Sequence, residues 1–221
     1  KITAREIPHI INKSLSTFET YWASNEFELF NDNDSSATKL RQALRQARGD
    51  LAAEPQYHFD IKPHPHQEEM LEQLAMERSL HQRYRNLVVA ATGTGKTLIS
   101  AFDFAQFLKA KPDATFLFIA HREEILKQAR AAYRGVLKQQ QFGELWVGGN
   151  QPQQYRQLFA SIQTLNNQLP VLRLTADYYD YIVIDEVHHI AANSYRQVVD
   201  FFTPQVLLGL TATPERADGS D

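Results

Sequence analysis

The sequence predicts an α/β domain in which helices cover both faces of a parallel β-sheet, preceded by a short helical segment. Three features carry this prediction. From residue 66 onward, short apolar runs alternate with helical segments, the pattern of right-handed βαβ crossovers. A glycine-rich loop follows the first apolar run and opens a helix, and two acidic residues end a later run. Ligands of such sheets bind at the carboxyl ends of the strands, where both motifs fall.

Residues 1–60 are predicted to form a helical lead-in and linker. A polar run at 31–36 reads as a loop, a second short helix is expected at 38–48, and three prolines make 50–65 an extended connector. The first helix is predicted from apolar residues that recur at steps of three and four, namely Ile7, Ile11, Leu15, Phe18 and Trp22.

Residues 61–221 are predicted to form the α/β domain itself. Helices are expected at 66–80, from Thr97 onward, at 122–139 and at 194–202. The apolar runs at 87–91 and 181–184 are typical of fully buried strands. Further strands are expected at 115–120, 144–147, 158–162 and 206–210.

Composition excludes several classes of protein. The chain has 221 residues, of which 43% are hydrophobic and 22% charged, so it is neither collagen-like nor disordered. No apolar stretch approaches the roughly 20 residues of a membrane span. Zero cysteines exclude a disulfide framework and a thiolate metal site, and they suit a cytoplasmic protein. Because the chain starts at Lys1 without a signal peptide and ends abruptly, we expect it to be a piece of a longer chain.

The net charge of −3 gives no indication of nucleic-acid binding, because domains that bind nucleic acid are typically strongly basic and this chain is mildly acidic. Any nucleic-acid surface must therefore be local, made by a few side chains and backbone amides.

Residues 90–97 have the pattern A-x-x-G-x-G-K-T between an apolar run and a helix. Glycines allow backbone N–H groups to curl around phosphates, and the helix N-terminus adds a positive dipole end. Lys96 is predicted to reach the β- and γ-phosphates, and the Thr97 hydroxyl to bind Mg²⁺. Ala90 stands where the strict pattern has glycine. The predicted nucleotide contacts here are Thr92, Gly93, Thr94, Gly95, Lys96 and Thr97.

Asp185 and Glu186 stand at the tip of the predicted strand 181–184. A charge there is costly unless it meets a cation or solvent. Asp185 is predicted to hold Mg²⁺, and Glu186 to orient and deprotonate the attacking water. With Lys96 they form the predicted catalytic set.

Two histidines follow these acids. A zinc site is disfavoured because the chain has no cysteine and no His-x-x-x-His spacing here. His188 is predicted to link the ATP site to a neighbouring loop, and His189 to serve local packing.

Together with Thr211-Ala212-Thr213, these motifs resemble the motor core of superfamily 2 nucleic-acid helicases of the DEAD/DEAH type, from about Lys62 to the chain end. The resemblance implies the first of two RecA-like domains, which hydrolyses ATP with Mg²⁺. It implies that Thr211 and Thr213 couple hydrolysis to strand binding. It also implies a second RecA-like domain in the full-length chain, absent here, whose arginine fingers complete the site.

Other positions match the family less tightly. Gln67 resembles the glutamine that reads the adenine amino group, although His64 and His66 replace the usual flanking residues. Arg122 resembles a phosphate contact of motif Ia. Later strand-binding loops correspond to Gly148, Gly149 and Thr164, which would use backbone N–H and hydroxyl donors. An ordinary loop or helix face is the competing interpretation at each position.

Residues 179–219 are most similar to bacterial restriction- and repair-type translocases, some of which have an N-terminal phospholipase-D-like nuclease module. Residues 17–22 are similar to the helical tail that leaves that module. A plain amphipathic helix that packs on the motor is the alternative.

The leading functional hypothesis is the ATP-binding half of an ATP-dependent helicase or translocase, with DNA favoured over RNA and no membrane partner. The main alternative is the motor subunit of a restriction-type nuclease that moves along duplex DNA without unwinding it. A binding module that uses ATP only as a switch is disfavoured by the intact Lys96, Asp185 and Glu186, and a P-loop kinase or GTPase by the Asp-Glu-x-His motif. Without a second domain, the fragment is expected to bind nucleotide weakly and hydrolyse it poorly.

Overall fold

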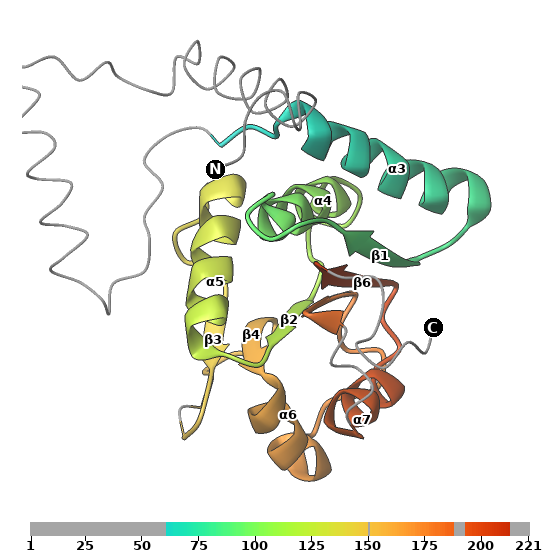
Figure 1. The fold of residues 1–221 in the computed structure, drawn as a ribbon. Helices are drawn as coiled ribbons and strands as arrows, with labels where there is room; N and C mark the ends of the chain where they lie inside the picture. Colours follow the sequence, from blue (N-terminus) through green and yellow to red (C-terminus); the bar gives the residue numbers. More distant parts are fainter. Residues whose placement is uncertain (1–60, 150, 188–192, 213–221) are drawn as a thin grey trace, which may run out of the picture. The chain divides into compact units, whose positions relative to one another are not determined.

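The computed structural model describes residues 61–149, 151–187 and 193–212 (Figure 1). The predicted lead-in at 1–60 lies outside these ranges, as do His188, His189 and Thr213. No helix in the described ranges combines the length and the apolar character that crossing a membrane requires.

The fold is built on a six-stranded sheet whose neighbouring strands all pair in parallel. Parallel neighbours need crossover connections, and helices occupy most of them. In spatial order the strands are β1 (Arg85–Val89), β6 (Val206–Thr211), β5 (Tyr181–Asp185), β2 (Phe116–Ala120), β4 (Gln157–Ser161) and β3 (Glu144–Trp146).

Helices cover both faces of the sheet, as predicted (Figure 1). One face packs against α3 (Pro65–His81), α4 (Lys96–Ala110) and α5 (Glu123–Leu137), and the other against α6 (Ile162–Gln168) and α7 (Asn193–Phe201). Alternate residues of β2 serve the two cores, because successive side chains of a strand point to opposite faces. Phe116 and Phe118 join the first core, and Leu117 and Ile119 the second.

The described helices and strands follow the predicted ones with ends shifted by one or two residues, with two differences. The short helix α6, followed by the 3₁₀ turn η1 (Leu169–Val171), was not predicted. It begins directly at the end of β4, where the Ser161 side chain accepts a hydrogen bond from the Thr164 N–H.

The expectation that the run at 87–91 is a fully buried strand was wrong. This run contributes to β1, which ends at Val89 and lies at the edge of the described sheet. There Leu87 is 51% exposed and Val89 40% exposed, while Val88 is buried. An apolar run reveals strand character but not a strand's place in the sheet, so the exposed face could not be predicted from composition.

Asp180, just before β5, joins this strand to the segment that precedes β2. Its carboxylate accepts hydrogen bonds from Lys111 Nζ at 2.6 Å and from the Thr115 backbone N–H at 2.9 Å. Burial alone would raise the pKa of Asp180, but the bonds from Lys111 and Thr115 outweigh it and lower the pKa below its ordinary value. The ionised form therefore stabilises the fold.

Asp180→Asn is expected to lower the free energy of unfolding by about 1–2 kcal/mol at neutral pH, because the charge-assisted bonds are lost while Lys111 stays partly solvated. The folded-state pKa is depressed, so the contribution is present above the unfolded pKa and disappears as the pH falls through the folded pKa. Urea unfolding at neutral pH and near pH 3 measures the difference. Asp113→Asn is the matched control, because the Asp113 side chain is 94% exposed. A loss for Asp180→Asn that is equal at both pH values would contradict the assignment.

Candidate nucleoside triphosphate site

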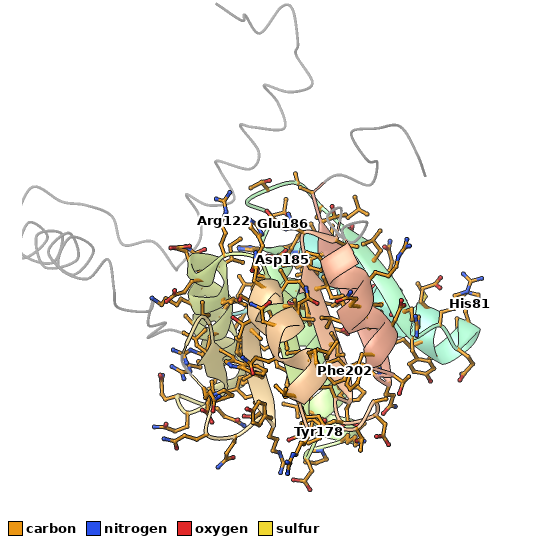
Figure 2. All side chains as sticks on the ribbon, turned by 90° about the horizontal axis from the view of Figure 1, so that it is seen from below. His81, Arg122, Tyr178, Asp185, Glu186 and Phe202 are labelled. Carbon is orange, nitrogen blue, oxygen red and sulfur yellow. The ribbon has the colours of Figure 1, made fainter. Side chains whose placement is uncertain are left out.

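The described residues of the predicted nucleotide site lie at the carboxyl edge of the sheet, where β1, β2, β5 and β6 end. Arg122, Asp185 and Glu186 lie together at one end of the domain, and Tyr178 lies at the opposite end (Figure 2). The convergence follows from the topology, because parallel strands all end on the same edge.

The loop between β1 and α4 has the backbone of a phosphate-binding turn. Gly93 and Gly95 have φ values of +85° and +79°, in the left-handed region that glycine adopts most readily. Gly95 caps α4, and no side chain caps this helix end. The N-terminal N–H groups of a helix without a side-chain cap are suited to an anion.

Lys96 lies across this loop. Its ammonium donates hydrogen bonds to the carbonyls of Ala90 at 2.8 Å and Ala91 at 3.1 Å. The departure from the strict motif at Ala90 has a packing explanation, because this side chain is buried in the core below the loop. The Ala90 N–H also donates to the Thr211 carbonyl at 3.0 Å, which ties the start of the loop to the end of β6.

Gln67 supports the loop from α3. Its side chain is buried, its Nε2 donates to the Thr94 carbonyl at 3.0 Å, and its Oε1 accepts from the His64 N–H at 2.9 Å. A Cβ added at Gly95 would lie 2.4 Å from Gln67 Nε2. The adenine contact stays a prediction, and it would use the second N–H of the amide.

Asp185 ends β5 and is half-buried, and its Oδ1 accepts a hydrogen bond from the Glu186 N–H at 3.0 Å. Burial and the neighbouring charge of Glu186 raise the pKa of Asp185, and the charges of Lys96 and His121 partly oppose this. A bound cation would favour the ionised form. The Asp185 carboxylate and the Thr97 hydroxyl are hard oxygen donors, which suit Mg²⁺ with water completing its shell.

Glu186 follows with φ +56°, a left-handed conformation that is uncommon for a residue other than glycine. Its Oε2 lies 2.7 Å from Nδ1 of His121, the residue after β2. Such strained backbone clusters at functional sites. The contact of His121 with Glu186 could not be predicted from the sequence, because only the strand order shows that β2 lies beside β5.

Tyr195 of α7 is a second residue near the acid pair that no sequence motif indicates. Its side chain is 3% exposed, and its hydroxyl has no hydrogen-bond partner in the described part of the chain. Burial, together with the charges of Glu186 and Asp185, raises its pKa to about 12. The hydroxyl therefore stays protonated and is available as a donor near the two carboxylates.

The predicted nucleic-acid contacts have different environments. Arg122 is exposed at the start of α5, and Gly148 and Gly149 are exposed in the turn after β3. Thr164 is buried, and its Oγ1 accepts hydrogen bonds from the Gly148 N–H at 3.1 Å and from Ser161 Oγ at 2.8 Å. Thr164 therefore supports the glycine turn from below, and its predicted contact with nucleic acid stays a prediction. Thr211 is buried at the end of β6.

A loop built for phosphates, facing a carboxylate pair two strands away, defines a P-loop nucleoside triphosphatase domain of the RecA-like type. The chain belongs to the family described as "Type III restriction enzyme, res subunit", whose profile matches residues 60–216. This membership confirms the resemblance to superfamily 2 helicases and translocases, a family of ATP-dependent motor proteins.

The relatives include both a helicase and a restriction enzyme subunit, the two kinds of protein that the sequence predicts. The chain is 30% identical over 174 residues to the putative mitochondrial ATP-dependent helicase irc3 of Schizosaccharomyces pombe. The aligned region covers 73% of this chain and 27% of that protein. It is 30% identical over 141 residues to the type I restriction enzyme EcoAI endonuclease subunit of Escherichia coli, covering 59% and 17%. The chain thus spans less than a third of either relative.

Solved structures support the fold. The Sulfolobus solfataricus SWI2/SNF2 ATPase core in complex with double-stranded DNA superposes with a TM-score of 0.58 at 16% identity, covering 72% of this chain and 34% of that one. The likeness confirms the RecA-like architecture.

Proposed function

We propose that this chain is the ATP-binding half of an ATP-dependent DNA helicase or translocase, in which Mg²⁺-dependent hydrolysis drives movement on nucleic acid. The observation that carries the proposal is the convergence of the phosphate loop with Asp185 and Glu186 at one sheet edge. We further propose residues 61–221 as the first of two RecA-like domains, since the chain covers only 27% of its helicase relative.

Each site residue has a role that its position supports. The N–H groups at the start of α4 and the Lys96 ammonium would bind the phosphates, and Gln67 keeps the loop in shape through Thr94. Thr97 and Asp185 would hold Mg²⁺, which when bound neutralises charge that develops on the phosphates. Glu186 would orient the attacking water and take its proton. Thr211 is placed to transmit changes, because its carbonyl contacts the start of the loop.

For nucleic acid we propose Arg122 together with the backbone N–H groups of Gly148 and Gly149, which are exposed. Such contacts go to the phosphate backbone and need little net positive charge. DNA is favoured over RNA because the superposed SWI2/SNF2 core is described in complex with double-stranded DNA. The kinship to a type I restriction subunit supports the second candidate, a duplex translocase that does not unwind.

The test is the ATPase rate of the full-length protein without nucleic acid and with single-stranded DNA, duplex DNA or RNA. We expect duplex DNA to raise the rate most, and Lys96→Ala to remove it. Displacement of one DNA strand would indicate unwinding, whereas displacement of a triplex-forming third strand without duplex opening would indicate translocation. No hydrolysis under any of these conditions would contradict the proposal.

A further inference from the structure

The contact between His121 and Glu186 joins two parts of the proposed machinery. Nδ1 of His121 lies 2.7 Å from Oε2 of Glu186, an ion-pair distance rather than a hydrogen bond of good geometry. The Oε2 atom is shielded from solvent, while the Glu186 side chain as a whole is 37% exposed. One carboxylate oxygen is thus engaged by the imidazole.

The sheet brings these residues together. β2 and β5 are neighbours, with Ile119 opposite Ile184 in register. Two positions further along each strand lie His121 and Glu186, at the edge where both strands end. The left-handed backbone of Glu186, with φ +56°, sets the direction in which its side chain leaves the strand end. The contact is therefore a consequence of strand order and backbone conformation together.

His121 is also covalently next to Arg122, the exposed residue at the start of α5. Phosphate binding at Arg122 would act on the backbone of the residue that holds Glu186. The proposed nucleic-acid contact, Arg122, is thus one peptide bond away from His121, the residue that contacts Glu186. In the described part of the chain, no other proposed nucleic-acid residue is adjacent in sequence to a residue that contacts Glu186.

We propose that His121 is a positioning residue that holds the Glu186 carboxylate in an idle orientation until nucleic acid binds at Arg122. The inference rests on the proposed function, since it assigns a regulator to the same site. It does not depend on the charge of the imidazole, because a neutral ring with its proton on Nδ1 also faces the carboxylate as a donor. Release of His121 would free Glu186 for the attacking water and so couple strand binding to hydrolysis.

The test uses three substitutions at His121 in the full-length protein. Asparagine places its amide where Nδ1 lies, glutamine moves the amide out to the position of Nε2, and alanine removes the group. His121→Ala and His121→Gln are expected to raise the DNA-free ATPase rate by about five- to tenfold, the effect of losing one intramolecular polar interaction of ordinary strength. The duplex-stimulated rate should change little, so the stimulation ratio falls by the same factor. His121→Asn should keep the low DNA-free rate.

His81→Ala is the matched control, because His81 lies at the end of α3, far from Glu186 (Figure 2), and should leave both rates unchanged. If alanine prevents folding, the asparagine and glutamine variants still separate the outcomes, since both are polar amides. Equal loss of both rates in His121→Ala, or an unchanged stimulation ratio, would overturn the inference. If the unsubstituted protein hydrolyses no ATP with any nucleic acid, the proposed function itself fails, which is a distinguishable result.

Discussion

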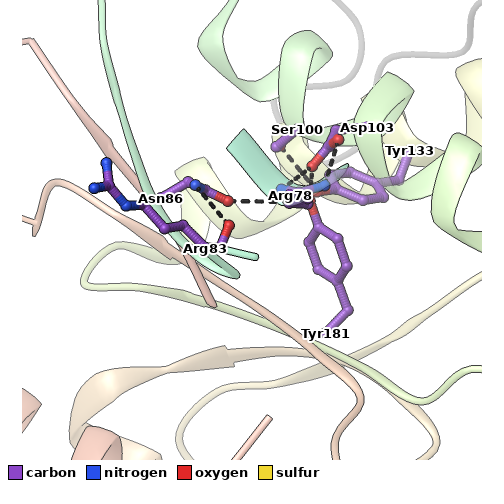
Figure 3. Close-up of polar contacts among 7 residues, drawn as sticks. All are labelled: Arg78, Arg83, Asn86, Ser100, Asp103, Tyr133 and Tyr181. Carbon is purple, nitrogen blue, oxygen red and sulfur yellow. Dashed lines mark hydrogen bonds and ion pairs between the residues drawn. The ribbon is translucent and has the colours of Figure 1, made fainter. Parts of the chain in front are cut away.

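Arg78→Ala is expected to lower the free energy of unfolding by about 3–5 kcal/mol, because it leaves a buried carboxylate without its cation. Arg78 of α3 donates two parallel hydrogen bonds to Asp103 of α4, at 2.8 and 2.7 Å (Figure 3). The Arg78 and Asp103 side chains are only 14% and 7% exposed. Two parallel N–H to carboxylate bonds are the strongest geometry for this pair.

The pair belongs to a wider polar network. The Tyr181 hydroxyl at the base of β5 donates to the same carboxylate, and Arg78 Nε donates to Asn86 Oδ1 of β1 at 3.0 Å (Figure 3). Burial lowers the pKa of the Arg78 guanidinium, but Asp103 more than compensates and raises it above its ordinary value. Loss of Arg78 therefore affects α3, α4, β1 and β5 at once.

Urea unfolding of the chain, followed by tryptophan fluorescence, measures the effect. Arg83→Ala is the matched control, because the Arg83 side chain is 70% exposed and its contact with Glu77 is 3.4 Å long, so the change should stay below about 0.5 kcal/mol. Replacing both partners with apolar residues, Arg78→Met with Asp103→Leu, should recover part of the loss. A loss below about 1 kcal/mol for Arg78→Ala would show that the buried pair is not needed for stability.

Glu186→Gln is expected to reduce ATP hydrolysis by about 10²–10⁴-fold while leaving nucleotide affinity nearly unchanged. Glutamine has almost the same size and shape, so the loop and the Asp185 contact to the residue 186 N–H persist. It cannot accept the proton of the attacking water, which is the role proposed for Glu186. Affinity is spared because the proposed phosphate contacts come from the N-terminus of α4 and from Lys96.

The measurement is the ATPase rate of the full-length protein at saturating duplex DNA, alongside binding of a fluorescent ATP analogue. Glu72→Gln makes the same chemical change on the exposed side of α3 and should be neutral. If Glu186→Gln kept more than about a third of the rate, another group would have to be the base.

Most of the fold could be predicted because its signals are local. Apolar runs of four to six residues between helical segments show the strands of a parallel sheet, and the glycine pattern at 93–95 shows the turn into α4. The order of motifs along the chain predicted the family that the comparisons confirm. The short helix α6 escaped notice because its cap, Ser161, is also the last residue of β4.

Interactions between segments far apart in sequence could not be predicted in this way. Nothing in the run at 87–91 indicates that β1 lies at the sheet edge, with Leu87 half exposed. Thr164 matches a strand-binding motif, and only the fold shows that its buried hydroxyl accepts hydrogen bonds from Gly148 and Ser161. Arg78 and Asp103 are 25 positions apart in the sequence and join two helices, and no sequence pattern predicts that they pair.

The sequence by itself therefore determines the phosphate loop and the acid pair, because each is formed by residues that follow one another along the chain. Which groups surround that chemistry depends on the order of strands in the sheet. That order places His121 beside Glu186, and the packing of helices α7 and α3 brings the buried Tyr195 near Glu186 and sets Gln67 against Thr94. Strand order is determined by how the two apolar cores pack as a whole, so these neighbours emerge only in the folded molecule.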